Sequence, residues 1–563
     1  MRSNSSWKRI VSGGLGLLCA GSVFAARVES REYSEEREPC TQYLATRQPH
    51  FGDTHVHTTY SFDANGQDTR NTPWDAYRLA MGERVGLQPY DADGKPSRTA
   101  QLRRPLDFTV VTDHAELLGE IRACSNPDGP GGSSDLCWTY QNFRGMSFAL
   151  FAVRNLIGRK RFEFCGPDGS LCLDQARIVW KDIQAAADQA YDKTKECSFT
   201  SFVGYEWTAS VGNGDNLHRN VVFRNARVPD LPVSWVDTPS AHDLWKHLQE
   251  QCIDAVAGCD VLTIPHNSNL SGSGLMFASA KLTGPQDIDL PVDKQEALLR
   301  QRWEPLVEIM QHKGDSECLP GQGNNDEICG FEKLSYNSFA GVGRIAEQGI
   351  AESAGLPVAT TLEPDKRAMV REALKKGLLQ HSTIGANSLK YGIIASTDTH
   401  LGTPGLTMEE DAKGHGGAGS RVEIGLPDDL EFNPGGLAVL WAEENSRDSL
   451  FAAMQRREAY GTSGTRPVVR FFGGWDFDQS MCKGQDFAQQ GYAGGVPMGG
   501  DLPTRGTGDG DPSFAVWALQ DPGSDEYPGT PLQRIQIVKG WLEDGDLKEK
   551  VIDVAGRKNR ASV

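Results

Sequence analysis

The chain has 563 residues, of which 38% are hydrophobic and 23% are charged, and this composition excludes a disordered or fibrous protein. The net charge of −18 repels phosphate backbones, so a general grip on nucleic acid is not expected. A small anionic substrate would have to be attracted by local positive charge, against the field of the whole chain.

The first 25 residues have the pattern of a secretory signal peptide. Lys8 and Arg9 form a basic start, an apolar stretch covers residues 10–24, and residues 23–25 supply the small residues of a cleavage site. An uncleaved anchor is the alternative, but the apolar stretch is short for a membrane span. We therefore expect a periplasmic or secreted protein with no stable membrane insertion after cleavage.

The cysteines are typical of a disulfide-bonded protein. None of them forms a CxxC pair, which argues against a structural zinc ribbon. An oxidising compartment would allow close neighbours to join short loops, and eleven of the twelve cysteines follow the signal, so at least one stays unpaired within the chain. The pairs predicted from spacing are Cys124 with Cys137, Cys165 with Cys172, Cys252 with Cys259, and Cys318 with Cys329.

Short apolar runs alternate with helical patterns from residue 51 onward. The runs cover residues 107–112, 201–205, 261–265, 306–310 and 391–396, and each leads to an ionisable residue. Their length and β-branched content predict buried strands of a parallel sheet. Helices are predicted over residues 173–194, 241–257 and 364–379, which favours βαβ units.

Polar residues that recur at the carboxyl ends of strands are typical of a barrel with its active site at that face. The insertions over residues 124–172, 268–300 and 313–385 are long, and we expect them to shape a substrate pocket.

The pattern changes near residues 464–467. Beyond this point residues 468–472, 513–519, 532–541 and 549–554 predict strands, and no helix of useful length is predicted. We therefore predict a barrel over residues 26–465 and a small β-rich accessory region over residues 466–563.

Histidines and carboxylates gather at the predicted strand ends. His55 and His57 stand two residues apart, so a strand directs both imidazoles to one face. A lone buried histidine is more often a core residue than a ligand. Six of the twelve histidines follow this pattern, however, and with acidic neighbours they would be costly to bury without cations. The other members are His114, Glu206, His266, His312, Asp398 and His400.

Mixed imidazole and carboxylate ligation without thiolates suits zinc, manganese or iron. A carboxylate such as Glu206 or Asp398 can bridge neighbouring cations. Cations held roughly 3.5–4 Å apart activate a shared water and clamp the attacking and leaving oxygens. The pattern therefore predicts a hydrolase with two or three divalent cations, acting above all on phosphate esters.

The order of these motifs resembles the PHP (polymerase and histidinol phosphatase) superfamily. Within it, the sequence looks most like the domain of unknown function 3604 family, in the motifs HVHTTYSFDA, FTVVTDHAE, GYEWT, HRNVVF, IPHN, GIIASTDTHLG and YGTSGTRP. The resemblance covers most of the chain after the signal and implies a distorted (β/α)7 barrel, commonly with three metal ions. Many such proteins are phosphoesterases.

Carried onto this chain, the resemblance implies metal contacts from the strand-end residues and from Asp63. For Asp63 a simple turn is the alternative. The implied set is His55, His57, Asp63, His114, Glu206, His266, His312, Asp398 and His400.

Three further residues are candidates for a catalytic role. Asp113 could orient an imidazole or act as a general base, although a hydrogen-bond acceptor behind the metal ligands is the favoured interpretation. His218 could contact substrate or donate a proton to the leaving group, and an ordinary loop histidine is an equal alternative. Arg466 could hold an anionic substrate, or it could join the barrel to the C-terminal region through a salt bridge.

The sequence thus predicts an exported hydrolase of a small-molecule substrate, and it contains no GxSxG nucleophile elbow. Phosphate ester hydrolysis is the first hypothesis. The same activated water also cleaves amides, lactones, carboxylic esters and sulfate esters, and the acidic net charge favours a neutral substrate. A non-catalytic protein that binds metal or ligand is the third hypothesis, but no ligand position of the pattern is lost. Fold alone does not choose among these.

Overall fold

The computed structural model describes residues 31–563 except residues 127, 133, 144–158, 213, 322–325, 335–363, 409–432, 485, 507–509 and 557–563. The predicted signal peptide, residues 1–25, lies outside the described residues. The chain divides into two units, Met1–Tyr33 and Ser34–Val563, and every described helix and strand belongs to the second unit. Among these helices, none combines the length and the hydropathy that a membrane crossing requires.

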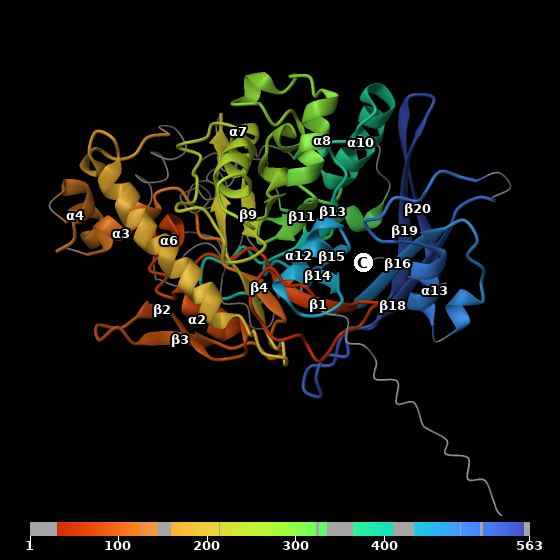
Figure 1. Cartoon of the computed structure of the whole chain (residues 1–563), viewed down its shortest axis with the longest axis horizontal. Coiled ribbons are helices and arrows are strands. Elements are labelled where there is room, and N and C mark those ends of the chain that lie inside the picture. The colour runs from red at the N-terminus through yellow and green to blue at the C-terminus, as the bar shows by residue number, and fades with distance from the viewer. Residues whose placement is uncertain are drawn as a thin grey trace, which may run out of the picture. The chain divides into compact units, whose positions relative to one another are not determined.

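A five-stranded sheet carries the first histidine motif (Figure 1). Parallel pairing joins β1 to β4 and β4 to β5, while β14 runs antiparallel to both β1 and β15. The predicted strand at residues 107–112 is present as β4, and the one at residues 201–205 is divided between β5 and β6 (Gly204–Trp207). Their residues are fully buried, as expected for short apolar strands. In sheet order the strands are β15 (Ala459–Thr462), β14 (Leu437–Ala442), β1 (Gln48–Asp53), β4 (Phe108–Val110) and β5 (Thr200–Phe202).

Two three-stranded sheets carry the remaining strand-end residues. In the first, β9 runs antiparallel between β6 and β10. In the second, β11 pairs in parallel with β13 and antiparallel with β12. The strands are β6 (Gly204–Trp207), β9 (Arg219–Phe223), β10 (Val261–Pro265), β11 (Leu306–Gln311), β12 (Gly314–Asp315) and β13 (Gly392–Ala395).

The predicted mixture of helices and strands is confirmed, but the described strands form separate sheets and no closed barrel. The chain leaves one sheet and enters the next at Val203, between β5 and β6, and β9 and β14 interrupt the parallel order. Backbone hydrogen bonds nevertheless join the sheets at the carboxyl ends of strands. Asp398 N donates to His55 O over 3.0 Å, and Glu206 N donates to Asp113 O over 3.0 Å.

Helices cover the sheets largely where the sequence predicts them. The helix predicted over residues 173–194 is α6 (Ser170–Ala190), which buries Val179, Trp180 and Ile183. The one predicted over residues 241–257 is α7 (Ala241–Leu248), extended by a π-helical turn, Gln249–Ile253. The third is α10 (Val370–Ile384).

The other helices and strands before residue 464 are short. The helices are α1 (Phe62–Gly66), α2 (Pro73–Ala80), α3 (Leu118–Ser125), α4 (Asp135–Asn142), α8 (Lys294–Trp303) and α12 (Arg447–Gln455). The strands form two hairpins, β2 (Val85–Tyr90) with β3 (Pro96–Ala100), and β7 (Ser210–Val211) with β8 (Asp215–Asn216).

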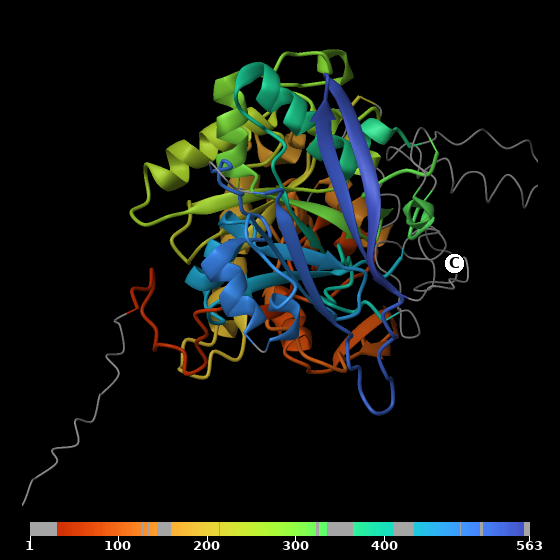
Figure 2. The same cartoon turned by 90° about the vertical axis from the view of Figure 1, so that its right-hand side faces the viewer.

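The C-terminal region contains the strands that the sequence predicts. A sheet of order β17–β16–β18 is followed by a hairpin, which Figure 2 shows as two long blue strands. The helix α13 (Phe487–Gly494) was not predicted. The strands are β16 (Val468–Gly474), β17 (Gly495–Pro497), β18 (Ser513–Leu519), β19 (Arg534–Glu543) and β20 (Asp546–Gly556).

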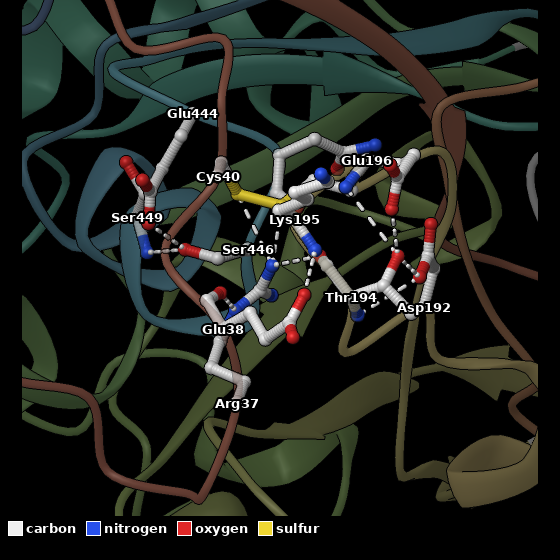
Figure 3. The surroundings of a disulfide bond; sticks show 12 residues. Arg37, Glu38, Cys40, Asp192, Thr194, Lys195, Glu196, Glu444, Ser446 and Ser449 are labelled. Atoms are coloured by element: carbon white, nitrogen blue, oxygen red, sulfur yellow. Dashed lines mark hydrogen bonds between the residues drawn. A yellow bond between two sulfur atoms is a disulfide. The ribbon is translucent and has the colours of Figure 1, made fainter.

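All four predicted disulfides are present. A fifth joins Cys40 to Cys197, and spacing could not reveal it because 157 positions separate the two residues. Around this bond Glu38 accepts a hydrogen bond from the Lys195 backbone (Figure 3). Among the described cysteines Cys482 is free and exposed. Five disulfides indicate a chain that folds in an oxidising, extracellular type of compartment.

Asp521 ties the C-terminal region to the segment before β4. Its carboxylate accepts hydrogen bonds from Arg104 Nη1 and Nη2, each 2.7 Å long, and from the Arg466 backbone over 2.7 Å. Burial would raise the pKa of this carboxyl, but the hydrogen bonds outweigh burial and lower the pKa to about 2. The ionised carboxylate is therefore the form that stabilises the fold.

We expect Asp521→Asn to lower the free energy of unfolding at pH 7 by roughly 1–2 kcal/mol, because it removes charge-assisted hydrogen bonds. Because the folded-state pKa is depressed, the contribution is present above the unfolded-state pKa of about 3.9 and is lost as the pH falls toward about 2. Denaturant unfolding at pH 7 and pH 3 measures the difference, which should shrink at the lower pH. The exposed Asp525→Asn serves as the control. A difference independent of pH would contradict the assignment.

Candidate metal centre

The ends of seven strands bring histidines and carboxylates into one buried cluster. His55 and His57 follow β1, and Asp398 and His400 follow β13. Every member except Asp63 is at most 8% exposed. Asp63 comes from the first turn of α1, and its side chain is 18% exposed. The remaining members are His114 after β4, Glu206 in β6, His218 before β9, His266 after β10 and His312 after β11.

Four donor atoms of the cluster face one another closely enough to surround a single cation. His55 Nε2 lies 3.2 Å from Glu206 Oε2 and 3.1 Å from Asp398 Oδ1. His57 Nε2 lies 3.1 Å and 3.0 Å from the same two oxygens. Asp398 has a φ of 55°, in the left-handed region that residues other than glycine adopt infrequently.

The second oxygen of Glu206 faces a different pair of imidazoles. Glu206 Oε1 lies 2.8 Å from His218 Nδ1 and 3.3 Å from His266 Nε2. The two oxygens of one carboxylate thus address two groups of ligands, which is the geometry of a bridging carboxylate.

A third group lies at the more exposed edge of the cluster. Asp63 Oδ2 is 2.9 Å from His114 Nε2 and 2.9 Å from His400 Nε2. His312 Nε2 lies 3.1 Å from Asp398 Oδ2, and its ring stacks on that of His400. The structure therefore brings together all the residues that the sequence proposes as metal ligands, Asp63 included.

Several donor atoms in this cluster are buried and make no well-aligned hydrogen bond with the described residues, although oppositely charged groups lie close to them. They are His57 Nε2, His266 Nε2 and Asp398 Oδ1. Desolvated polar atoms of this kind are costly unless something pairs with them. Each of these atoms faces an oppositely charged group. The set consists of imidazoles and carboxylates without thiolates, so these residues fit zinc, manganese or iron.

The electrostatics of the cluster demand positive charge. Burial by itself would raise the pKa of Asp63, Glu206 and Asp398, but the surrounding imidazoles lower all three pKa values far below their ordinary range. Burial would also lower the pKa of His57, yet contacts with Asp398 and Glu206 raise it to about 10. Without cations, protonated imidazoles balance the carboxylates.

At three other imidazoles, burial lowers the pKa more than the neighbouring carboxylates raise it. It lowers the pKa of His218 to about 4, and it also lowers the pKa values of His266 and His400. A lowered pKa favours the neutral ring, which is the form in which imidazole binds metals.

Two carboxylates hold the histidines of the first motif in place. Both oxygens of Glu308, in β11, lie 3.2 Å from His55 Nδ1. Sequence reasoning missed Glu308, although a glutamate inside a buried apolar strand was the available signal. A carboxylate on the far ring nitrogen orients a ligand histidine and raises its basicity.

Asp113 acts on His57 through Ser61. Its carboxylate accepts hydrogen bonds from Thr58 N at 2.6 Å, Thr58 Oγ1 at 2.7 Å and Ser61 Oγ at 2.8 Å. Ser61 Oγ in turn lies 2.8 Å from His57 Nδ1. With its oxygens occupied in this way, Asp113 has the geometry of a hydrogen-bond acceptor behind the metal ligands, and it reaches His57 through Ser61.

Arg466 lies elsewhere. Its guanidinium donates to the backbone carbonyls of Arg104 and Pro105 over 2.7 and 2.8 Å, near the amino end of β4. The metal cluster lies at the carboxyl end of that strand. The structure thus places Arg466 at the junction with the C-terminal region and away from the cluster.

Comparison with known proteins gives one family and one distant structure. No curated protein matches the chain. A solved two-domain protein from Bacteroides vulgatus ATCC 8482, described as containing a predicted PHP-like metal-dependent phosphoesterase, matches 76% of this chain and 69% of its own, with 11% identity and a TM-score of 0.28. A likeness this weak carries no conclusion about the fold or the reaction. The model of the family described as "Protein of unknown function (DUF3604)" matches residues 44–562. Because that match covers nearly the whole chain, the protein belongs to the DUF3604 family, in agreement with its sequence motifs.

Proposed function

We propose that this protein is an exported metal-dependent phosphoesterase that works with two or three divalent cations. Glu206 supports the proposal, because it is buried and its two oxygens face separate sets of imidazoles. One carboxylate between two cation positions is the arrangement that paired-metal hydrolases need. Export, with residues 1–25 as the signal, is supported by the five disulfides.

We also interpret the separate sheets as parts of one distorted (β/α)7 barrel over residues 26–465, with residues 466–563 as an accessory region. Single parallel bridges support this interpretation. One joins Val56 to Thr399 and another joins His114 to Glu206, so neighbouring sheets meet at the edge that carries the cluster.

Bound cations would polarise the substrate and make a water nucleophilic near neutral pH. The protein's own residues would hold the cations and orient the side chains of the ligands. Glu308 fixes the ring of His55, and Ser61 with Asp113 fixes the ring of His57, so that both Nε2 atoms face Glu206 and Asp398. A donor set fixed in this way needs little rearrangement when it binds its cations.

The exposed edge at Asp63, His114 and His400 is the side from which we expect substrate to approach, because Asp63 is the most exposed member of the cluster. Cations at that edge would attract an anionic group locally, against the net charge of −18. The same net charge favours a neutral substrate if phosphate is not the target. Hydrolysis of an amide, lactone, carboxylic ester or sulfate ester is therefore the second candidate.

The metal content of the mature chain tests the site. We expect two or three equivalents of zinc, manganese or iron per chain by mass spectrometry of the elements. His57→Ala should lose at least one equivalent, because it removes a donor atom from a buried set. His381→Ala, at an exposed histidine of α10, is the matched control and should retain all of the metal. Equal metal content in the two variants would refute the assignment.

The reaction is tested with the metal-loaded chain. We expect hydrolysis within a panel of phosphate monoesters and diesters, and a drop in kcat of at least about 100-fold in Asp398→Asn, which weakens the first ligand set. Activity restricted to lactones, amides, carboxylic esters or sulfate esters would select the second candidate. A fully loaded chain that leaves both panels untouched would end the hydrolase proposal.

A further inference from the structure

Arg300, in α8, is a buried arginine whose guanidinium has almost no polar partners. The side chain is 1% exposed, and Nε, Nη1 and Nη2 make no well-aligned hydrogen bond with the described residues. Nε lies 3.5 Å from Glu304 Oε2, which is an ion pair without hydrogen-bond geometry. Because a guanidinium carries five N–H donors and a permanent charge, both its donors and its charge need a partner.

The carboxylate of Glu304 already serves two other groups. Arg219 Nε donates to Glu304 Oε1 over 2.9 Å, and the Tyr391 hydroxyl donates to Oε2 over 3.2 Å. Arg219 and Glu304 are at most 2% exposed, so these charges lie in the protein interior. One carboxylate thus faces two buried guanidinium groups, and this group of residues carries one positive charge in excess.

A second buried carboxylate, Glu296, lies one turn before Arg300 in α8, but it is engaged elsewhere. Its oxygens accept hydrogen bonds from Ala280 N over 2.7 Å and from Ser279 Oγ over 2.9 and 3.0 Å. Lys281 Nζ lies 3.5 Å from Glu296 Oε2 and balances its charge. Glu296 therefore does not supply the hydrogen bonds that Arg300 lacks.

The other neighbours of Arg300 do not supply a negative charge either. Arg300 Cζ lies 5.9 Å from the centre of the Trp245 ring, close to the limit of about 6 Å for a cation–π contact. Lys376, in α10, adds positive charge. Burial, and then the charges of Arg300 and Arg367, lower the pKa of Lys376.

The position of Arg219 separates this group from the metal cluster. Successive side chains of a strand point to opposite faces of a sheet. Asn220, which follows Arg219 in β9, donates to Thr54 O over 3.2 Å, beside the first histidine motif. Arg219 therefore points to the other face of β9, where Arg300 of α8 shares Glu304 with it.

We infer that Arg300 binds a small monovalent anion of the size of chloride, and that this anion balances the positive charge that Arg300 and Arg219 carry in excess of Glu304. Ordered water would satisfy the N–H donors but would leave the buried charge uncompensated, whereas an anion meets both needs. The burial of all three residues favours an ion smaller than sulfate or phosphate. The inference does not depend on the proposed metal-dependent function.

Thermal unfolding of the mature chain at constant ionic strength, in sodium gluconate and in sodium chloride, tests the inference in solution. A ligand that binds only the folded chain raises the melting temperature as its concentration rises, so we expect the wild type to melt at a higher temperature in chloride. In Arg300→Met the apparent dissociation constant of chloride should rise at least about 100-fold, because the substitution removes the charge and the donors. Arg177→Met, at an exposed arginine of α6, is the matched control and should keep the wild-type response.

Anomalous diffraction from wild-type crystals grown in bromide locates the ion without any variant. We expect a peak beside the Arg300 guanidinium, and this peak together with the wild-type chloride response decides the matter if Arg300→Met does not fold. Density at that place without an anomalous signal would indicate ordered water and would overturn the inference. A chloride response that is the same in the wild type and in folded Arg300→Met would also overturn it, as would a bromide peak with no chloride response in solution.

Discussion

The carboxylate of Glu206 stands between the imidazoles of His55 and His57 on one side and those of His218 and His266 on the other. It is ionised and almost fully buried, so it requires positive charge beside it. Protons on the imidazoles can meet that need, and divalent cations would meet it better because they would also coordinate the buried atoms that make no well-aligned hydrogen bond. The surrounding structure meets this requirement by placing imidazoles on both sides of the carboxylate.

The residues that orient the ligand histidines come from several parts of the fold. The ends of the strands must therefore be held close together. Glu308 comes from β11, and Ser61 comes from the segment between β1 and α1. Backbone hydrogen bonds between residues 55–57 and residues 398–399 fix the first histidine motif against the last one, although nearly 350 positions separate them in the chain. Disulfides close loops around this framework, and the bond from Cys40 to Cys197 constrains the longest of them.

Much of the site could be predicted from sequence because short apolar strands that end in ionisable residues leave a local signal. His55, His114 and Asp398 all carry it. Glu308 lacks it, since it lies within its strand, and His218 lacks it as well, because the direction of β9 is a property of tertiary pairing. Arg466 shows the opposite problem. Its charge and its glycine-rich surroundings are compatible with an anion site, and only the fold shows that its guanidinium is used by backbone carbonyls. The pairing of strands is also a property of the fold and leaves no local signal. The sequence therefore favours a continuous parallel barrel, whereas the described strands form separate sheets.

We propose that Glu206 lies between bound cations. Anomalous diffraction from crystals of the metal-loaded protein, recorded on either side of the absorption edge of the bound metal, tests it most directly. We expect one peak beside Oε2, among His55, His57 and Asp398, and another beside Oε1. Density confined to the protein surface, or a fully occupied metal site elsewhere with the cluster unchanged, would contradict it.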